Sequence, residues 1–375
     1  MSAPYADIVV IGAGIAGLSV AAEIARSRSV VVLERESQPG YHATGRSAAL
    51  FFETYGPDVV RALTRASRSF YESPPAGFTS HPLLEACGAL FIARADQRAS
   101  LERFAAEDDV RHSGKIVTHD EMLALCPVLR KDYVAAGLFD PAPASIDVAS
   151  LLEGYRRQFR ERGGTLVTDA DVTGLSFEAG AWRLSTQAGE FSAGVIVNAA
   201  GAWADQIAKL AGIDAIGLEP RRRTALVARA HGADALSTRA LVIDIDEQFY
   251  FRAESGGILI SPADETLSPA CDAQPEEMDV AVAIDRVMAA TTLDICSVRS
   301  KWAGLRSFVA DRNPVVGFAP ADCRFFWLAA QGGYGLQTGP AMAELAAALI
   351  LQHAIPDRLG LTPELIKRLS PARFR

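Results

Sequence analysis

The chain has 375 residues, of which 49% are hydrophobic and 22% charged, and its formal net charge is −8. This length and composition exclude a single small domain, a disordered chain and a collagen or coiled-coil rod. The densest basic run, Arg221–Arg223, is short, so we expect no nucleic-acid partner. Five scattered cysteines contain no CxxC pair, so we expect no metal site.

Targeting signals are not apparent. The N-terminus leads almost directly into a predicted strand, Asp7–Ile11, without the basic and apolar regions of a secretory signal. The longest apolar stretch near the C-terminus, Ala341–Leu351, contains Glu344 and is too short to span a bilayer. We therefore expect a cytoplasmic protein without an integral membrane segment, and docking at the surface of the inner membrane stays open.

Three stretches of the chain predict a strand, a Gly-rich turn and a helix in succession. The first has a strand at Asp7–Ile11, a helix over residues 15–27 and a further strand at Ser29–Leu33. The second begins at Gly194, and the third begins at Arg324. Apolar runs of this kind suit strands that are buried on both faces of a parallel sheet.

The segments between these units are richer in strands. Helices are predicted at Ala149–Arg162 and Glu276–Thr291. Period-two patterns predict strands at Asp171–Phe177, Ala181–Thr186, Glu190–Ser192, Ala225–Ala230, Ala240–Ile243, Gln248–Arg252 and Ile258–Ser261. The economical arrangement is an α/β domain made of segments 1–84, 146–214 and 305–375, with a β-rich domain inserted twice, as 85–145 and 215–304.

The turn after the first strand has the spacing of a dinucleotide fingerprint. Gly12 permits the tight turn, Gly14 lets a pyrophosphate approach the backbone, and Gly17 lets the helix pack closely on the strand. Glu34 ends the second strand, where its carboxylate can accept hydrogen bonds from ribose hydroxyls. An acid at this position argues against NADP, but the fingerprint alone leaves FAD and NAD open.

The segment that follows, Pro39–Leu50, is rich in small residues, which let a backbone run close to a large planar ligand. Arg46 and Ser47 within it can serve phosphate or ring heteroatoms.

Together with Glu34, the sequences "IGAGIAG", "GYHATGRSAA", "VNAAGAWA" and "AAQGGYGLQTGPA" resemble the D-amino-acid oxidase and sarcosine oxidase superfamily of FAD enzymes. The likeness is closest to the bacterial D-arginine dehydrogenase branch, through "QPGYHATGRSAA", "PPAGF", "HPLL" and "WAGLRSFVAD". The resemblance implies a Rossmann-type FAD-binding domain of the glutathione reductase kind beside a β-rich substrate-binding domain.

The resemblance also assigns residues to the cofactor. The implied FAD contacts are Ala16, Glu34, Arg35, His42, Ala43, Thr44, Gly45, Arg46, Ser47, Ala48 and Ala49, with Val172 on the adenine side. Gly333, Tyr334, Gly335, Leu336 and Gln337 are implied at the flavin ring, where N–H groups at the start of a helix can stabilise negative charge. Some relatives tether the flavin to a cysteine just before the position of Arg306. This chain has none there, so we expect non-covalent FAD.

The implied substrate is an amino acid whose α-hydrogen leaves as hydride for flavin N5. Arg306 matches the residue that clamps the carboxylate, and a guanidinium fork suits that task. Tyr250, Arg223 and Gly333 match further pocket positions, and Tyr55 matches a tyrosine that covers the pocket. Tyr55, Tyr250 and Arg306 are the residues we expect to act in catalysis.

Two departures from the D-arginine branch concern the substrate side chain. Ala89 stands where that branch has an acid, and Leu50 stands where it has a histidine. A cationic side chain would then be buried without a partner, so we expect neutral or apolar D-amino acids to be preferred. Leu259 falls where oxidases of the superfamily place a lysine, which favours a dehydrogenase with another electron acceptor, such as a quinone.

Two other interpretations stay open. The same fold with a carboxylate clamp could oxidise a 2-hydroxy acid or a secondary, N-methylated amino acid. The chain could also bind FAD or NAD without turnover.

Overall fold

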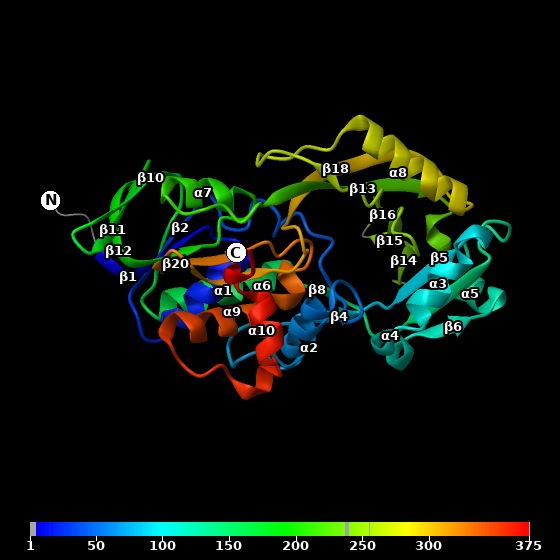
Figure 1. Cartoon of the computed structure of the whole chain (residues 1–375). Coiled ribbons are helices and arrows are strands. Elements are labelled where there is room, and N and C mark those ends of the chain that lie inside the picture. The colour runs from blue at the N-terminus through cyan, green and yellow to red at the C-terminus, as the bar shows by residue number, and fades with distance from the viewer. Residues whose placement is uncertain (1–4, 237–239, 255, 375) are drawn as a thin grey trace.

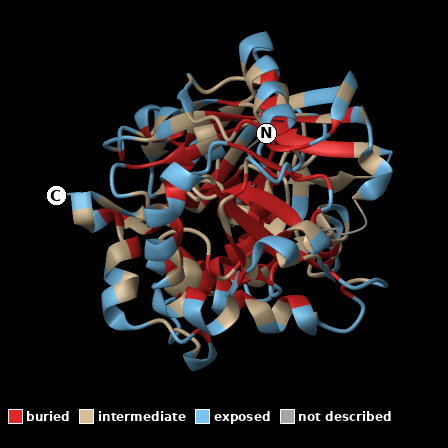
Figure 2. Cartoon of the chain, turned by 90° about the vertical axis from the view of Figure 1, so that its right-hand side faces the viewer, coloured by how far each residue is buried: buried red, intermediate tan, exposed pale blue. Residues whose placement is uncertain are grey.

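The computed structural model describes residues 5–236, 240–254 and 256–374. Two large sheets lie side by side, with a small sheet at their junction (Figure 1). Buried residues concentrate on the inner strands, whereas the outward faces of the helices are exposed (Figure 2). Among the described residues, no helix combines the length and apolar character needed to cross a membrane.

The first sheet is built from all three predicted strand–turn–helix units. Its order is β10-β11-β12-β1-β2-β9, and β20 joins β12 and carries β19 at its other edge. The strands are β1 Tyr5–Ile11, β2 Val30–Leu33, β9 Thr165–Val167, β10 Val172–Glu178, β11 Ala181–Thr186, β12 Gly189–Asn198, β19 Val315–Ala319 and β20 Asp322–Ala329. The pairings of β1 with β2 and β12, and of β12 with β20, are parallel.

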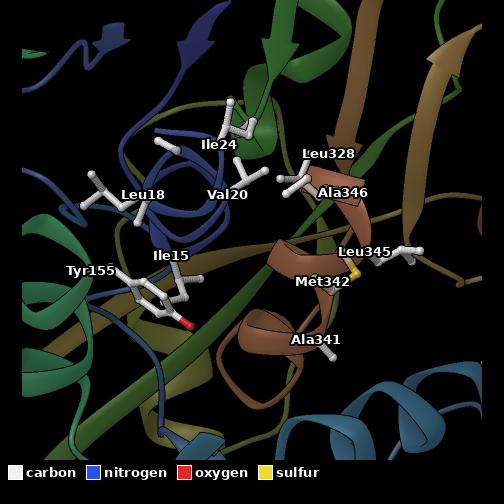
Figure 3. Close-up of a cluster of buried hydrophobic side chains, with 14 of the residues drawn as sticks. Ile15, Leu18, Val20, Ile24, Tyr155, Leu328, Ala341, Met342, Leu345 and Ala346 are labelled. Atoms are coloured by element: carbon white, nitrogen blue, oxygen red, sulfur yellow. The ribbon is translucent and has the colours of Figure 1, made fainter. Parts of the chain in front are cut away.

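Each face of this sheet packs against its own hydrophobic core. Ile8 and Val10 of β1 face a core shared with α1 Ile15–Ile24, α6 Val148–Glu161 and α9 Gly335–Leu351. Val9 and Ile11 face the opposite core, which includes α7 Ala204–Leu210. This alternation explains why the strands are apolar at every position. Figure 3 shows α1 beside α9, with Val20 of α1 directed toward Ala346 of α9 and Leu328 of β20.

The second sheet is mainly antiparallel, in the order β17-β13-β16-β15-β14-β5-β7-β6, and β18 pairs with β13. Its strands are β5 Ala89–Ala93, β6 Lys115–Val117, β7 Ala136–Asp140, β13 Glu219–His231, β14 Leu241–Asp244, β15 Tyr250–Glu254, β16 Gly257–Ser261, β17 Thr266–Leu267 and β18 Asp294–Phe308. The small sheet joins β3 Leu50–Phe51, β8 Ala144–Ile146 and β4 Leu84–Ala86. The other α-helices are α2 Asp58–Glu72, α3 Arg98–Ala105, α4 Asp108–Ser113, α5 His119–Leu125, α8 Glu277–Ala290 and α10 Pro363–Leu369.

The predicted α/β architecture is confirmed, with several differences in detail. The predicted strand Glu190–Ser192 and the strand that begins at Gly194 are one strand, β12, which pairs with β11 along its first half and with β20 at its end. The long strand β18 was not predicted, because residues 296–301 are exposed and carry no alternating pattern. Three of the predicted segment boundaries, 84/85, 145/146 and 304/305, fall inside β4, β8 and β18.

Candidate active site

A long cavity of about 350 Å³ runs along the carboxyl ends of β1 and β2 toward the second sheet. It has the position that the fingerprint predicts for a dinucleotide. Most residues predicted to contact the cofactor line it, namely Gly12, Gly14, Ala16, Glu34, Arg35, His42, Ala43, Thr44, Arg46, Ser47, Ala48, Val172, Gly333, Gly335 and Leu336.

The fingerprint glycines are held by tight backbone contacts. Gly12 has φ +102°, and a Cβ atom there would lie 2.5 Å from the carbonyl oxygen of Ala199. A Cβ atom on Gly17 would lie 1.8 Å from the carbonyl oxygen of Gly12, so Gly17 serves helix packing rather than the cavity wall. Thr44 Oγ1 accepts a hydrogen bond from the N–H of Ile15 at 3.0 Å and so fixes the start of α1.

Glu34 supports the same turn from the neighbouring strand. Its carboxylate accepts hydrogen bonds from the N–H of Ala13 at 2.7 Å and from the N–H of Glu36 at 3.0 Å. Burial raises the pKa of the Glu34 carboxyl, and these two hydrogen bonds oppose the increase. The residue therefore has a structural task in addition to the ribose contact, which remains a prediction.

An aromatic platform closes the end of the cavity near Val172. Trp203 lines the cavity, with the Arg35 guanidinium 4.7 Å from its ring centroid and the His42 ring centroid at 4.6 Å. His42 is also 2.8 Å from Glu36 Oε1. Trp203 is not among the residues predicted from the sequence, although an aromatic residue in the turn of the second strand–turn–helix unit is a usable signal.

Arg46 lies at the cavity wall but is engaged by protein atoms. It donates to the carbonyl oxygens of Ala273 at 2.9 Å and Ala303 at 3.0 Å, and it pairs with Asp272 at 2.5 Å. Its own carbonyl accepts from the Trp302 indole at 3.0 Å. Arg46 therefore ties the cofactor loop to β18, and its predicted contact with phosphate or ring heteroatoms stays a prediction.

Four other predicted cofactor residues do not line the long cavity. Gly45 lies within its loop, where its N–H donates to the Gly40 carbonyl at 2.8 Å. Ala49 and Gln337 line a second cavity, which shares Arg306 and Leu336 with the long one and is called the substrate cavity here for the role proposed below. Tyr334 lines a third cavity, the outer chamber, which shares Tyr55 and Glu247 with the second.

Two residues of the cavity wall bear on how a large ligand would bind: one offers a hydrogen-bond donor, and the other offers a thiol. Gln331 Nε2 is buried with no hydrogen-bond partner among the described residues, so the cavity offers an unused donor. Cys271 also lines the cavity and is only partly buried. The expectation of non-covalent attachment considered only the segment before Arg306, so it stays a prediction.

Arg306 of β18 lies where the long cavity meets the substrate cavity. A Cβ atom on Gly333 would lie 2.7 Å from Arg306 Cζ and 2.8 Å from Nε, so the glycine makes room for the guanidinium. No carboxylate pairs with Arg306 in the part of the chain that the structure describes. Burial lowers the pKa of Arg306, but the neighbouring Tyr55 and Tyr250 outweigh it and raise the pKa, so the group is charged.

The strand register excludes one of the three consecutive arginines from the face of the site, and the cavity lining then identifies Arg223. Arg223 pairs with Gly304 and Arg221 with Arg306 in the β13–β18 ladder, so these residues share one face. Arg223 lines the cavities and is held by the Asp264 carbonyl at 2.8 Å and by Glu265 at 3.2 Å. Arg222 points the other way, toward Asp279 at 2.9 Å.

Tyrosines surround the junction. Tyr250 is 8% exposed and lines both cavities. Tyr55 donates to Glu247 Oε2 at 3.1 Å and separates the substrate cavity from an outer chamber, which Arg61, Arg223, Glu265 and Arg312 also line. Burial raises the pKa of Tyr55, and the neighbouring Arg306 charge opposes the increase, so the phenol is protonated at neutral pH.

The remaining wall of the substrate cavity is apolar. It is formed by Leu50, Phe52, Leu241, Ile243, Ala263 and Leu336. Ala89 was expected on this wall, but it is completely buried and does not line the cavity, whereas Leu241, its partner in the β5–β14 ladder, does. Leu259, on β16, lines none of the three cavities described above, and none of the described residues that line them is a lysine.

The donor atoms of His231, Asp294 and Cys296 lie within 4.8 Å of one another on the exposed end of the β13–β18 ladder. Sequence spacing does not reveal this grouping, because His231 is 63 residues from Asp294 and meets Asp294 and Cys296 only through the β13–β18 pairing. His231 Nδ1 already lies 3.2 Å from Asp294 Oδ2.

Comparison with known proteins agrees with this geometry. Residues 7–349 match the family model described as FAD dependent oxidoreductase. Mitochondrial dimethylglycine dehydrogenase from Rattus norvegicus is 25% identical over 96% of this chain, which spans only 44% of that relative. Glycine oxidase from Bacillus licheniformis is 25% identical, with 93% of this chain and 94% of the relative covered.

Among solved structures, L-alpha-glycerophosphate oxidase from Mycoplasma pneumoniae with FAD bound has a TM-score of 0.82 at 19% identity. That match covers 94% of this chain and 95% of the other. None of these three proteins is a D-arginine dehydrogenase, so that part of the resemblance stays a prediction.

Proposed function

Since the chain belongs to the FAD-dependent oxidoreductase family, we propose that it oxidises D-amino acids to imino acids, which hydrolyse to 2-oxo acids and ammonia. The observation that carries this proposal is Arg306, a charged side chain at the junction of the two cavities without a carboxylate partner among the described residues. A partly desolvated guanidinium is costly unless an anion binds it, and the α-carboxylate of an amino acid is such an anion.

FAD, bound in the long cavity, supplies the acceptor for the hydride, at flavin N5. The protein orients the substrate, because a carboxylate on Arg306 leaves the α-carbon at the cavity junction. Tyr250, which lines both cavities, adds a hydroxyl donor there. Holding the carboxylate at one end fixes which hydrogen faces the cofactor cavity, and this positioning is the main contribution of the chain to the rate.

The amine must lose its ammonium proton before hydride can leave. The Tyr55 hydroxyl donates to Glu247 and accepts from Arg306, so one lone pair of its oxygen is available to the substrate amine. Glu247 lines the outer chamber as well as the substrate cavity. A proton passed from the amine through Tyr55 to Glu247 would therefore leave through the outer chamber, and no base at carbon is needed.

The apolar wall supports a preference for neutral or apolar side chains. Leu50, Leu241 and Ile243 offer no partner for a cation, and burying an unpaired charge against them would be costly. Glu247 is the one carboxylate among the described residues that line this cavity, and it already accepts the Tyr55 hydroxyl hydrogen bond. Without a lysine among the described lining residues, we propose a dehydrogenase that passes electrons to another acceptor, such as a quinone, rather than to oxygen.

A second candidate is the oxidation of an N-methylated amino acid. It is favoured by the likeness to dimethylglycine dehydrogenase and shares the carboxylate clamp, so Arg306 does not separate the two. A 2-hydroxy acid would use the same clamp and remains an alternative substrate.

Anaerobic bleaching of the flavin tests the proposal. D-leucine, D-methionine, D-phenylalanine and D-arginine are compared with their L-enantiomers, N-methylglycine and D-2-hydroxyisocaproate, each with the same protein preparation. We expect apolar D-amino acids to bleach the flavin fastest. Faster bleaching by D-arginine would refute the side-chain preference. Bleaching by only the N-methylated or hydroxy compound would refute the D-amino-acid proposal.

A further inference from the structure

A proline interrupts the helix that follows the flavin-facing turn. Helix α9 contains Pro340 near its start. Because proline has no N–H, the carbonyl of Leu336, four residues earlier, lacks its helical hydrogen bond. Leu336 lines both the cofactor cavity and the substrate cavity, so the missing bond lies directly behind their shared wall.

Helix α2 supplies the missing partner from one face. The Tyr71 hydroxyl donates to the Leu336 carbonyl at 2.6 Å, and Tyr71 is only 2% exposed. Ser67 Oγ accepts from the N–H of Ala341 at 3.1 Å. Thr64 Oγ1 accepts from Gln337 Nε2 at 2.9 Å. Positions 64, 67 and 71 are spaced by three and four residues, so they share one helix face.

We propose that Tyr71 is a positioning residue for the cofactor: its hydroxyl replaces the bond that Pro340 removes and holds the turn Gly333–Gln337 in its flavin-receiving conformation. The inference depends on FAD as cofactor and not on the identity of the substrate. Tyr71 lines none of the cavities described above and so acts only through Leu336.

Loss of the Tyr71 hydroxyl should weaken FAD binding as well as lower the stability of the protein. Without the hydroxyl, the Leu336 carbonyl loses the bond that replaces its helical one, and a buried carbonyl without a hydrogen bond is costly. In the apoprotein the adjoining cavity lets the first turn of α9 loosen and expose that carbonyl to water. FAD binding must then reverse this loosening, which weakens binding.

The Tyr71→Phe substitution removes only the hydroxyl. We expect FAD titration of the apoprotein to show about tenfold weaker binding, which corresponds to about 1.4 kcal/mol. We also expect a lower flavin reduction potential. The N–H groups of the turn Gly333–Gln337 would be held less firmly and would stabilise the negative charge of the reduced flavin less. Tenfold weaker relative binding of the reduced form corresponds to about 30 mV.

Tyr155→Phe is the matched control. Tyr155 is 1% exposed and belongs to the same core, beside Ile15 in Figure 3, but it makes no hydrogen bond to α9 within the residues that the structure describes. We expect its FAD affinity and reduction potential to stay within twofold and a few millivolts of the unmodified protein. Equal behaviour of the two tyrosine variants would overturn the proposal.

The decisive comparison repeats Tyr71→Phe in a protein that already carries Pro340→Ala. Alanine restores an N–H that can bond the Leu336 carbonyl, so Tyr71→Phe should then change FAD affinity less than twofold. A tenfold loss in both backgrounds would overturn the proposal. If Tyr71→Phe alone does not fold, the double variant should recover folding and FAD binding, and failure of that recovery would likewise overturn it. Because substrate plays no part in these assays, their result is independent of the proposed activity.

Discussion

Gly333→Ala is the substitution whose effect is most directly set by the geometry of the site. The added Cβ atom would lie 2.7 Å from Arg306 Cζ, 2.8 Å from Nε and 2.9 Å from Nη1, closer than real Cβ atoms approach other heavy atoms. Gly333 does not have a positive φ, so alanine fits the backbone. The guanidinium is the flexible end of its side chain, so it should move while the fold persists.

The expected magnitude follows from the bonds that a displaced guanidinium loses. A hydrogen bond to a charged group contributes about 1.5–3 kcal/mol. Losing one of two such bonds to the substrate carboxylate should raise KM about 10- to 150-fold. Steady-state kinetics with a redox dye and D-leucine measures this change, and thermal unfolding should show a melting temperature close to that of the unmodified protein.

Gly174→Ala is the control, because a Cβ atom on Gly174 meets nothing nearer than 3.5 Å. It adds the same methyl group in β10 and should leave KM unchanged. A Gly333→Ala enzyme with KM within twofold of the unmodified value would refute the assignment of Arg306 as carboxylate clamp.

Three further predictions concern the wall, the cofactor and pH. Leu50→Asp should lower kcat/KM for D-leucine about 10- to 100-fold and raise it for D-arginine, because it places an anion on the apolar wall; an unchanged substrate ratio would contradict this. Acid precipitation should release all flavin as free FAD, equally from Cys271→Ser, whereas flavin retained in the pellet would indicate a covalent bond. Because burial raises the pKa of Glu34 above 4.5, its contribution to apoprotein stability is complete below that pH and is lost as pH rises through the folded pKa. Glu34→Gln should remove this loss of stability, measured as the free energy of unfolding from urea curves at several pH values. The same pH dependence in both proteins would contradict the role of Glu34.

The cofactor half of the site could be read from the sequence because its signals are local. Gly12, Gly14 and Glu34 lie within one strand–turn–helix–strand unit, so spacing along the chain fixes their spatial relation. The bonding of Arg46 could not be read in this way. Its partners Asp272 and Ala303 are more than 200 residues away and meet it only when the two sheets pack.

Prediction of the substrate-binding residues depended on strand register, which sequence patterns define poorly. Alignment with the family put Ala89 on the pocket wall, but Ala89 is fully buried and does not line the cavity, whereas Leu241, its partner on the same face of the β5–β14 ladder, does. A one-residue change of register moves a side chain to the opposite face. The same physics left Arg222 and Arg223 undecided until the β13–β18 ladder was known.

The rate of anaerobic flavin reduction by D-leucine, compared between the unmodified protein and Arg306→Ala at saturating FAD, tests the central claim most directly. With the guanidinium intact, the flavin should bleach rapidly. With alanine in its place, reduction should slow at least a hundredfold while the flavin spectrum of the resting protein stays the same. Equal reduction rates in the two proteins would mean that the substrate is held by other residues.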